Sequence, residues 1–280
     1  MQKLALACVV AFVACGPSNR GNGSGGDDSD GGGGSGGSGG SGGGSYTVYA
    51  DSDTVLYSID LASQSLVTVG PFDAPNNDTM TDLAVAPDGT IYVISETELY
   101  TANPGTGQAT AVGSLSTCGA DMVALTTLPD GTLWTGDFKG ALCQIDLTTS
   151  PPTVKPAVTM GNAMALTGDF AAVSNGTVFG TAYRLDDGAG SGTQANNLLV
   201  TLDVVTGAVT TIGSTGFPEL YGVAFAQGKV FGFTHDGTGR VATIDTTTGV
   251  GSLFGTFTDP TTSKGIAFAG AGVSSLVTIE

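Results

Sequence analysis

The chain has 280 residues, and its 25 acidic against 8 basic side chains give a net charge of −17 at pH 7. A surface of this sign repels nucleic-acid phosphates and anionic lipid headgroups, so the composition argues against a nucleic-acid-binding protein. We interpret the charge as a source of solubility outside the cytoplasm, with attraction of cations as the alternative.

The first 15 residues have the features of an export signal. One lysine near the start precedes an apolar run that is too short to span a bilayer as a helix. Residues 12–15, Phe-Val-Ala-Cys, resemble a bacterial lipobox, which implies that Cys15 is lipidated and becomes the mature N-terminus. The alternatives are cleavage before Cys8 or an ordinary secretory signal. The Gly16 that follows resembles the Gram-negative pattern that sorts lipoproteins to the outer membrane.

Residues 16–45 are expected to be a flexible tether. They are rich in glycine and serine and contain no large apolar side chain, so they cannot bury enough surface to offset chain entropy. A chain of this length has an r.m.s. span of roughly 30 Å, enough to hold a domain clear of a headgroup layer. Residues 46–280 remain, and they are enough for one globular domain.

Two sequence units recur within this domain, and each occurs five times. The first is a short apolar run that closes on an acid or amide, at Asp60, Asn103, Asp146, Asp203 and Asp245. The second, as in DLAVAPDGTIYV, is marked by Leu83, Leu125, Phe170, Val223 and Ile266. Most copies are 42 to 45 residues apart, and the spacings of 53 and 57 residues contain an insertion at 184–196.

Each unit predicts β-strands joined by tight turns. Apolar and polar residues alternate over four to seven positions, which is the period of a strand. The tripeptides PDG and SNG between two runs are typical of hairpins, because glycine adopts positive φ and Asp or Asn bonds its own backbone. Four short strands about every 42 residues predict an all-β fold, a β-propeller of five four-stranded blades.

The pattern LYxID, then TG, then LAVxPDGTxYV resembles the YVTN and NHL-like group of bacterial extracytoplasmic propellers. The resemblance covers all of residues 46–280. It implies the fold and leaves the activity open, because propellers carry many functions.

The two ends of the domain are expected to share one blade. The first hairpin, 54–70, has no inner strand ahead of it, and the last inner strand, predicted at 264–269, has no hairpin behind it. Joining them removes an exposed sheet edge. Residues 46–50 and 273–279 both suit the second position of this blade, and the sequence does not choose between them.

Cys118 and Cys143 are the two cysteines outside the export signal. An even number of cysteines in an exported domain favours a disulfide, with two buried free thiols as the alternative.

Chemistry-bearing side chains are expected on one face of the propeller. The loops that lead into inner strands and those that join second to third strands open on the same face, called the upper face here. The first set carries Asp78, Asp82, Asp121, Asp169 and Glu219, and the second carries Asp137, Phe138, Lys139, the insertion 184–196, His235, Asp236 and Arg240. The closing acids of the first unit are expected to form turns on the opposite, lower face.

Within this set we single out the candidate metal or ligand residues Asp82, Asp121, Asp169, Glu219 and His235. Carboxylates that converge from separate blades suit Ca²⁺, which takes several oxygen ligands. The alternative is that they cap turns and line a wet channel. When the repeats are aligned, Asp82 and Asp169 fall at the same position, and Asp121 and Glu219 fall three positions earlier. The alignment therefore predicts two layers of carboxylates along the axis, rather than one ring.

Three functions fit this face. The first is a non-catalytic binding or scaffold module for a glycan, a peptide or a protein. The second is a Ca²⁺-dependent hydrolase of the lactonase or lyase kind, in which the only histidine, His235, would be the imidazole base. The third is Ca²⁺ binding by the carboxylates without catalysis, to which the wet channel is the alternative. Tyr183, Phe217 and Tyr221 suit either core or ligand contact, whereas the alternation around Trp134 favours core. We predict the binding module, because no nucleotide or redox motif is present.

Overall fold

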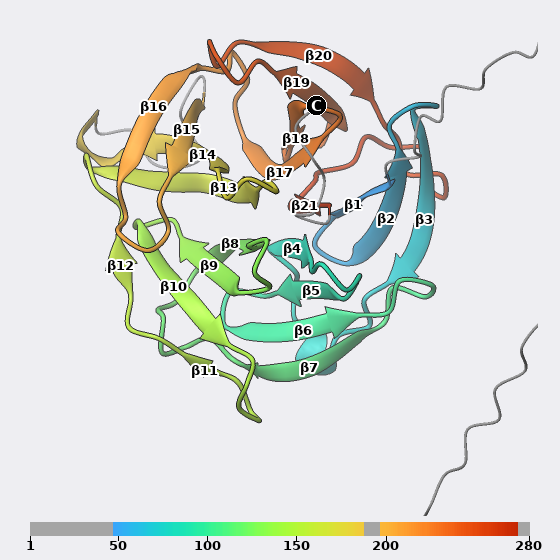
Figure 1. Cartoon of the computed structure of the whole chain (residues 1–280). Helices are drawn as coiled ribbons and strands as arrows, with labels where there is room; N and C mark the ends of the chain where they lie inside the picture. Colours follow the sequence, from blue (N-terminus) through green and yellow to red (C-terminus); the bar gives the residue numbers. More distant parts are fainter. Residues whose placement is uncertain (1–46, 188–196, 274–280) are drawn as a thin grey trace, which may run out of the picture. The chain divides into compact units, whose positions relative to one another are not determined.

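The computed structural model describes residues 47–187 and 197–273. The export signal, Cys15, the tether and most of the insertion therefore lie outside the described residues. The described strands form five antiparallel sheets arranged around a central axis, so the domain is a five-bladed β-propeller, as the repeats predict (Figure 1). Within the described ranges, no helix has the length and apolarity needed to cross a membrane.

Four of the blades follow one another along the chain, with strands ordered from the axis outwards. Blade 2 contains β4 (Asp82–Val85), β5 (Ile91–Ile94), β6 (Glu98–Ala102) and β7 (Ala109–Ser114). Blade 3 contains β8 (Met122–Thr127), β9 (Leu133–Asp137) and β10 (Ala141–Asp146), and its outer strand is split into β11 (Thr153–Val154) and β12 (Val158–Thr159). Blade 4 contains β13 (Met164–Ala172), β14 (Val178–Arg184), β15 (Leu198–Leu202) and β16 (Val209–Ser214). Blade 5 contains β17 (Leu220–Ala226), β18 (Lys229–Thr234), β19 (Arg240–Ile244) and β20 (Gly251–Thr256).

Blade 1 closes the ring with strands from both ends of the domain, as predicted. Its order is β21 (Gly270–Gly272), β1 (Thr47–Asp51), β2 (Val55–Asp60) and β3 (Ser65–Pro71). The N-terminal segment therefore takes the second position. The short helical turns η1 (Pro75–Asn77) and η2 (Leu185–Asp187) lie between strands.

The predicted inner strand of the closing blade, 264–269, is wrong. The structure pairs β21 with β1 instead, with Gly270 opposite Asp51 and Ala271 opposite Ala50. Ile266 and Phe268 are buried in the apolar cluster between blades 5 and 1. The segment is held there by bonds from Phe268 N–H to the Thr234 carbonyl and from Ala269 N–H to the Asp51 carbonyl. The alternating apolar residues Ile266 and Phe268 therefore pack between blades 5 and 1 and do not form a strand.

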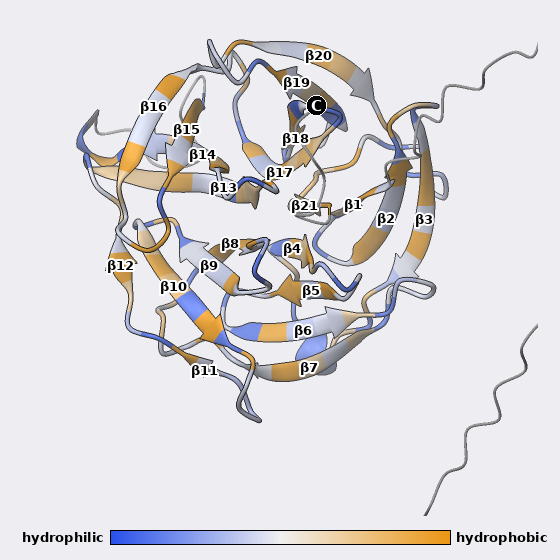
Figure 2. Ribbon diagram, in the orientation of Figure 1, coloured by the Kyte–Doolittle hydropathy of each residue, from blue (hydrophilic) through white to orange (hydrophobic). Residues whose placement is uncertain are grey.

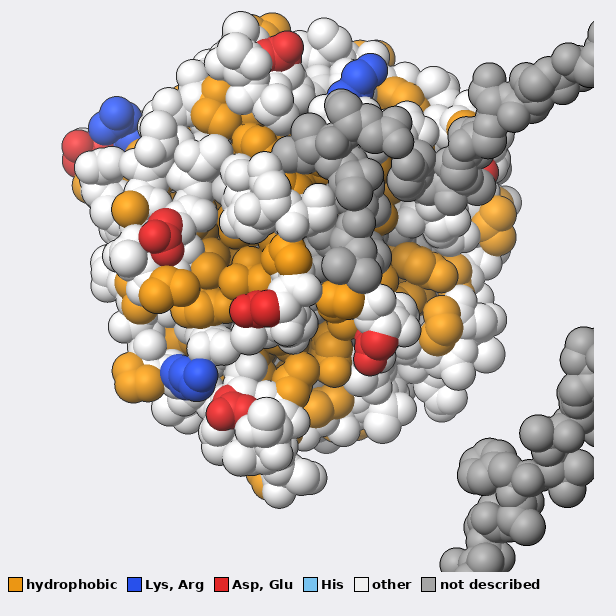
Figure 3. Space-filling view, viewed as in Figure 1, with side chains coloured by type: hydrophobic (Ala, Val, Ile, Leu, Met, Phe, Trp, Pro, Cys, Tyr) orange, Lys and Arg blue, Asp and Glu red, His pale blue; other side chains and the backbone are white. Residues whose placement is uncertain are grey.

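Apolar clusters between neighbouring blades form the core. The inner strands β4, β8 and β13 are buried on both faces, whereas the outer strands β7, β16 and β20 are mostly exposed or half-buried (Figure 2). Trp134 is buried in the cluster that joins blades 3 and 4, which confirms its predicted core role. In the view of Figure 3, hydrophobic side chains gather toward the middle of the domain and charged ones are scattered around them.

The axis is almost filled by side chains. The free space among the inner strands is a cavity of about 10 Å³, bordered by residues such as Leu83, Leu125, Phe170, Val223 and Ala271. That is room for about one water molecule. A ligand therefore cannot pass along the axis without displacing the inner strands.

The predicted disulfide is present. Cys118, in the loop before β8, is bonded to Cys143 in β10, with 5.9 Å between their Cα atoms. The bridge holds the inner-strand loop of blade 3 against its third strand.

Candidate functional site

Asp82 begins β4, the inner strand of blade 2, and is fully buried. Its Oδ1 accepts a bond from the N–H of Leu83 at 2.8 Å. Its Oδ2 accepts one from the N–H of Leu125 in β8 at 2.5 Å. The carboxyl group therefore ties the inner strands of blades 2 and 3 together.

Asp169 repeats this arrangement between blades 4 and 5. A register irregularity in β13 between Leu166 and Phe170 accompanies its position. Its two oxygens accept bonds from the N–H of Phe170 at 2.5 Å and of Val223 in β17 at 2.7 Å. The Asp82 and Asp169 carboxyls also lie close enough to act on each other electrostatically. Burial raises the pKa of both groups well above the usual value, and the charge of Asp169 adds to the effect on Asp82.

Asp51, at the end of β1, is a third fully buried carboxyl. In blade 1 the position of Asp82 is taken by Gly270, and Asp51 lies opposite this glycine. A Cβ atom on Gly270 would lie 2.2 Å from Oδ1 of Asp82 and 2.7 Å from Oδ1 of Asp51. The Asp51 side chain therefore occupies space that a side chain on Gly270 would need.

The other predicted acids lie outside this buried group. Asp121 forms an exposed ion pair with Lys139, with Nζ 2.9 Å from Oδ2. Glu219, which is half-buried, has positive φ and accepts the N–H of His235 on its carbonyl. The structure thus joins Asp82 and Asp169 and separates them from Asp121. Across the described part of the chain, no three His, Cys, Asp or Glu side chains gather in an arrangement that could hold a metal.

Two more upper-face acids serve the backbone or a neighbouring side chain. Asp78 accepts a hydrogen bond from the hydroxyl of Tyr100. Asp137 Oδ1 accepts the N–H groups of Lys139 and Ala141 and so shapes the loop between β9 and β10.

His235 is part of a row of rings on the upper face. Its ring stacks on Tyr221 with 4.6 Å between centroids and 10° between planes. The Phe138 ring also contacts Tyr221, with 6.0 Å between the ring centroids and 58° between the planes. The three rings are half-buried, so they suit ligand contact. Tyr183, in contrast, is buried and donates its hydroxyl to the Phe138 carbonyl at 2.5 Å.

The neighbouring Asp236 holds a loop. Burial acts to raise its pKa, but hydrogen bonds from Thr238, Thr234 and Arg240 outweigh burial and lower the pKa to about 2. Arg240 also lies over the Phe217 ring at 5.8 Å. Because Asp236 is occupied by these partners, His235 and Asp236 do not form a base and its orienting acid.

A polar cleft of about 330 Å³ opens where the chain closes the ring. It is lined by Ser52, Asp53, Thr54, Tyr57, Thr79, Asp259, Thr262, Lys264, Gly265, Ile266 and Ala267. We call it the seam cleft. Apart from Tyr57, which lies in β2, these residues come from the β1–β2 loop, the segment before β4 and the segment before β21, all of which open on the upper face.

Charges of both signs face the seam cleft. The Tyr57 hydroxyl donates to Oδ2 of Asp259 at 2.7 Å. This bond, followed by the N–H of Thr262, lowers the pKa of Asp259, so its carboxylate is ionised at neutral pH. Lys264 makes no ion pair with any described residue. The cleft therefore offers an anion and an ammonium group among several hydroxyls.

Sequence reasoning missed this cleft and Asp51. The loop 51–54 joins a second to a third strand, and the loop 258–265 leads toward an inner strand, so both are of the types expected on the upper face. The prediction missed the loop 258–265 because it assigned residues 264–269 to a strand.

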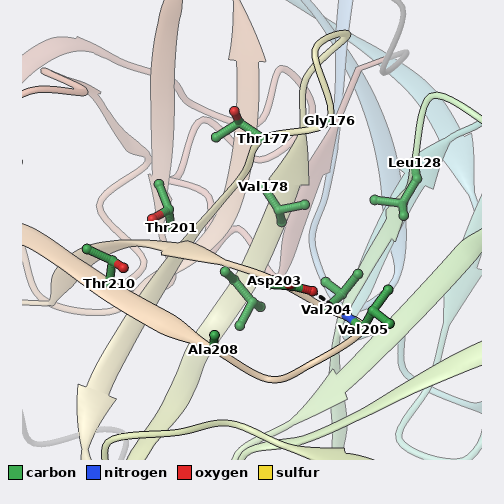
Figure 4. Close-up of a pocket in the computed structure, with 11 residues that line it drawn as sticks. Leu128, Gly176, Thr177, Val178, Thr201, Asp203, Val204, Val205, Ala208 and Thr210 are labelled. Atoms are coloured by element: carbon green, nitrogen blue, oxygen red, sulfur yellow. Dashed lines mark hydrogen bonds between the residues drawn. The ribbon is translucent and has the colours of Figure 1, made fainter.

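A larger groove of about 420 Å³ lies on the lower face of blade 4 (Figure 4). It runs between the turn before Val178 and the turn after Leu202. Blade 3 has a groove of about 340 Å³ at the equivalent turns. In blade 4 the carboxylate of Asp203 accepts the N–H groups of Val205 and Thr206, as expected for a closing acid. The groove thus forms wherever two lower-face turns of a blade lie side by side, and the carboxylate of its acid, Asp203, already bonds the backbone.

The fold and the upper face together define a five-bladed β-propeller with a polar cleft at its closing seam. No model of a known protein family matches the chain, and no curated protein matches it. Similar solved structures exist, and one is a chain of a nidogen/laminin complex. It is 11% identical with a TM-score of 0.50, over 82% of this chain and 99% of that chain.

Two further structures have lower TM-scores. A protein of unknown function from Bacteroides caccae is 11% identical with a TM-score of 0.44, over 82% of this chain and 98% of that chain. Streptogramin B lyase is 13% identical with a TM-score of 0.41, over 72% of this chain. The match spans 61% of the lyase chain. At these identities the similarity concerns the fold alone.

Proposed function

We propose that the domain is a non-catalytic binding module, held at the outer surface of a membrane by lipidated Cys15, and that it takes its ligand in the seam cleft. The observation that carries this proposal is the lining of the cleft, in which hydroxyls, two carboxylates and an unpaired lysine converge from three segments. Its volume of about 330 Å³ is within the range of small-ligand sites.

The chemistry of the lining favours a short glycan. Ser52, Thr54, Thr79 and Thr262 supply hydroxyls that both donate and accept, and such groups match the hydroxyls of a sugar. Asp53 and Lys264 add charged partners, whose hydrogen bonds are stronger than neutral ones. The aromatic row adjoins the cleft, because the His235 Nδ1 is 3.1 Å from the carbonyl of Phe268, next to Ala267 in the lining. A longer chain of sugars would extend onto these rings.

The candidate catalytic groups have other partners, and this favours binding over hydrolysis. Asp82 and Asp169 are fully buried and bonded to backbone N–H groups of the inner strands. A general base needs a free atom within hydrogen-bond reach of the substrate, and the two buried aspartates lack one. His235 stacks on Tyr221 with its Nδ1 at a carbonyl, which leaves Nε2 free. No described carboxylate orients this ring, because Asp236 bonds Thr234, Thr238 and Arg240 instead.

A printed array of oligosaccharides tests the proposal. The Cys15→Ser chain, which remains water-soluble if Cys15 is the anchor, is compared with the same chain carrying Lys264→Ala. We expect the unmodified cleft to bind a defined set of glycans and the Lys264→Ala variant to bind them at least about tenfold more weakly, since a charged hydrogen bond contributes about 1.5–3 kcal/mol.

Lys155→Ala is the matched control. Lys155 is an exposed lysine in the blade 3 groove on the lower side of the domain. Its loss should leave the glycan profile unchanged. Equal binding by the wild-type and Lys264→Ala chains, or an equal loss with Lys155→Ala, would refute the assignment of the cleft.

A further inference from the structure

Three fully buried aspartates, each from a different blade, lie near the upper end of the axis. Asp82 and Asp169 each accept backbone N–H groups from two neighbouring inner strands, and their carboxyls lie close enough to act on each other. Asp51 reaches the same place from blade 1, because its Oδ1 and that of Asp82 both border the position of a Cβ on Gly270. Asp51 also acts through its charge on both of the other carboxyls.

The Asp51 carboxyl has no partner for either oxygen among the described residues. The N–H groups of Gly270 and of Asp51 itself act to lower the pKa of this carboxyl, but less than burial raises it, and neither makes a hydrogen bond with it. A carboxylate that is ionised in such a place has lost its hydration without replacement, which costs several kcal/mol. The neutral, protonated acid avoids most of that cost.

Within residues 47–187 and 197–273, no positive side chain balances this group. The groups that face Asp51 are Asp53 on the β1–β2 loop, Tyr57 on β2, Asp82 on β4 and Asp169 on β13, and none is a cation. The ion pairs of the described residues both involve other acids. Adjacent carboxyls of this kind cannot all ionise, so protons are the balancing charge.

We propose that Asp51, Asp82 and Asp169 form a proton-binding site that holds the closing blade in the ring, so that the seam loosens when the site loses its protons. The inner strand of that blade is the shortest of the five inner strands. β21 pairs with β1 over only three residues, and Ala269 N–H donates to the carbonyl of Asp51 itself. Charge at Asp51 therefore acts directly on the strand that completes the ring.

The direction of the pH effect follows from the folded state. Burial raises the pKa of Asp51 above its unfolded value. The stabilisation is complete below the unfolded pKa and is lost as the pH rises through the folded pKa. Between the unfolded and the folded pKa, each proton that only the folded state holds makes the Tm fall by about 3–5 °C per pH unit, and the fall ends once the pH exceeds the folded pKa.

Thermal unfolding between pH 5 and pH 9 at constant ionic strength tests the site, with the wild-type chain, Asp51→Asn and Asp203→Asn. We expect the wild-type Tm to fall toward alkaline pH. Asp51→Asn should flatten this slope and have the higher Tm at the alkaline end. Asp203→Asn, which changes an exposed turn acid, should retain the wild-type slope. Parallel curves for the wild-type and Asp51→Asn chains would overturn the proposal.

Two further measurements on the wild-type chain keep the test independent of variant folding. Infrared spectroscopy at pH 7 should detect the C=O stretch of a protonated carboxyl group, with its shift in D₂O, and absence of this band would overturn the proposal. Millimolar Ca²⁺ should leave the alkaline Tm unchanged. A Ca²⁺-dependent rise that Asp51→Asn abolishes would instead identify a cation as the balancing charge.

Discussion

The disulfide makes a measurable prediction about stability. Reduction of the Cys118–Cys143 bond frees a chain segment with a sequence separation of 25 residues. In the chain-entropy relation, a loop of that length stabilises the folded state by about 3.5 kcal/mol at 25 °C. For a domain of this size, that loss corresponds to a fall in Tm of roughly 7–14 °C.

The assay compares one sequence in two redox states. Chemical denaturation of the oxidised and reduced wild-type chain isolates the cross-link, because no side chain is removed from the core. A Cys118→Ala and Cys143→Ala double variant serves as a second reference, and reductant should not change its midpoint. The entropic reasoning is refuted if the oxidised and reduced chains unfold at the same denaturant concentration.

Three other predictions concern the anchor, the closing strand and the surface. The wild-type protein should partition into a detergent phase after export, whereas Cys15→Ser should stay in the aqueous phase; equal partitioning would exclude lipidation. Gly270→Ala should lower the free energy of unfolding by at least about 3 kcal/mol in denaturant titrations, since the added Cβ would overlap two carboxylate oxygens. The control Gly105→Ala, whose added Cβ would have its nearest contact at 3.4 Å, should lower it much less. Asp121→Asn should leave the Tm nearly unchanged, because its partner Lys139 is exposed; a large fall would show that the pair is structural.

The fold was predictable because each blade repeats the same local rules. Turns such as PDG and SNG, and the acids at Asp60 and Asp245, recur at a nearly fixed spacing. Those acids accept the backbone N–H groups that follow them, as expected. The closing blade was harder, because small and apolar residues alternate throughout the segment 265–272. The prediction put Ile266 in the inner-strand position that Ala271 takes in the structure, five residues later. The packing of Phe268 against blade 5 distinguishes the two registers.

The site was less predictable, because its groups come together across blades. The repeat columns correctly paired Asp82 with Asp169, yet they carried no information on whether the carboxyls face solvent or the backbone of the next blade. Asp51 belongs to a different strand position, so no column includes it. Lys264 and Asp259 lie in a loop without a repeat counterpart. Contacts of this kind depend on ring closure, which a periodic pattern cannot encode.

Hydrogen–deuterium exchange with the tightest-binding glycan from the array is the most direct test of the proposed binding site. The account predicts slower exchange of backbone amides in residues 258–267, which line the seam cleft, and unchanged exchange in residues 203–210 of the lower groove. Protection confined to residues 203–210, with none at the seam, would contradict it.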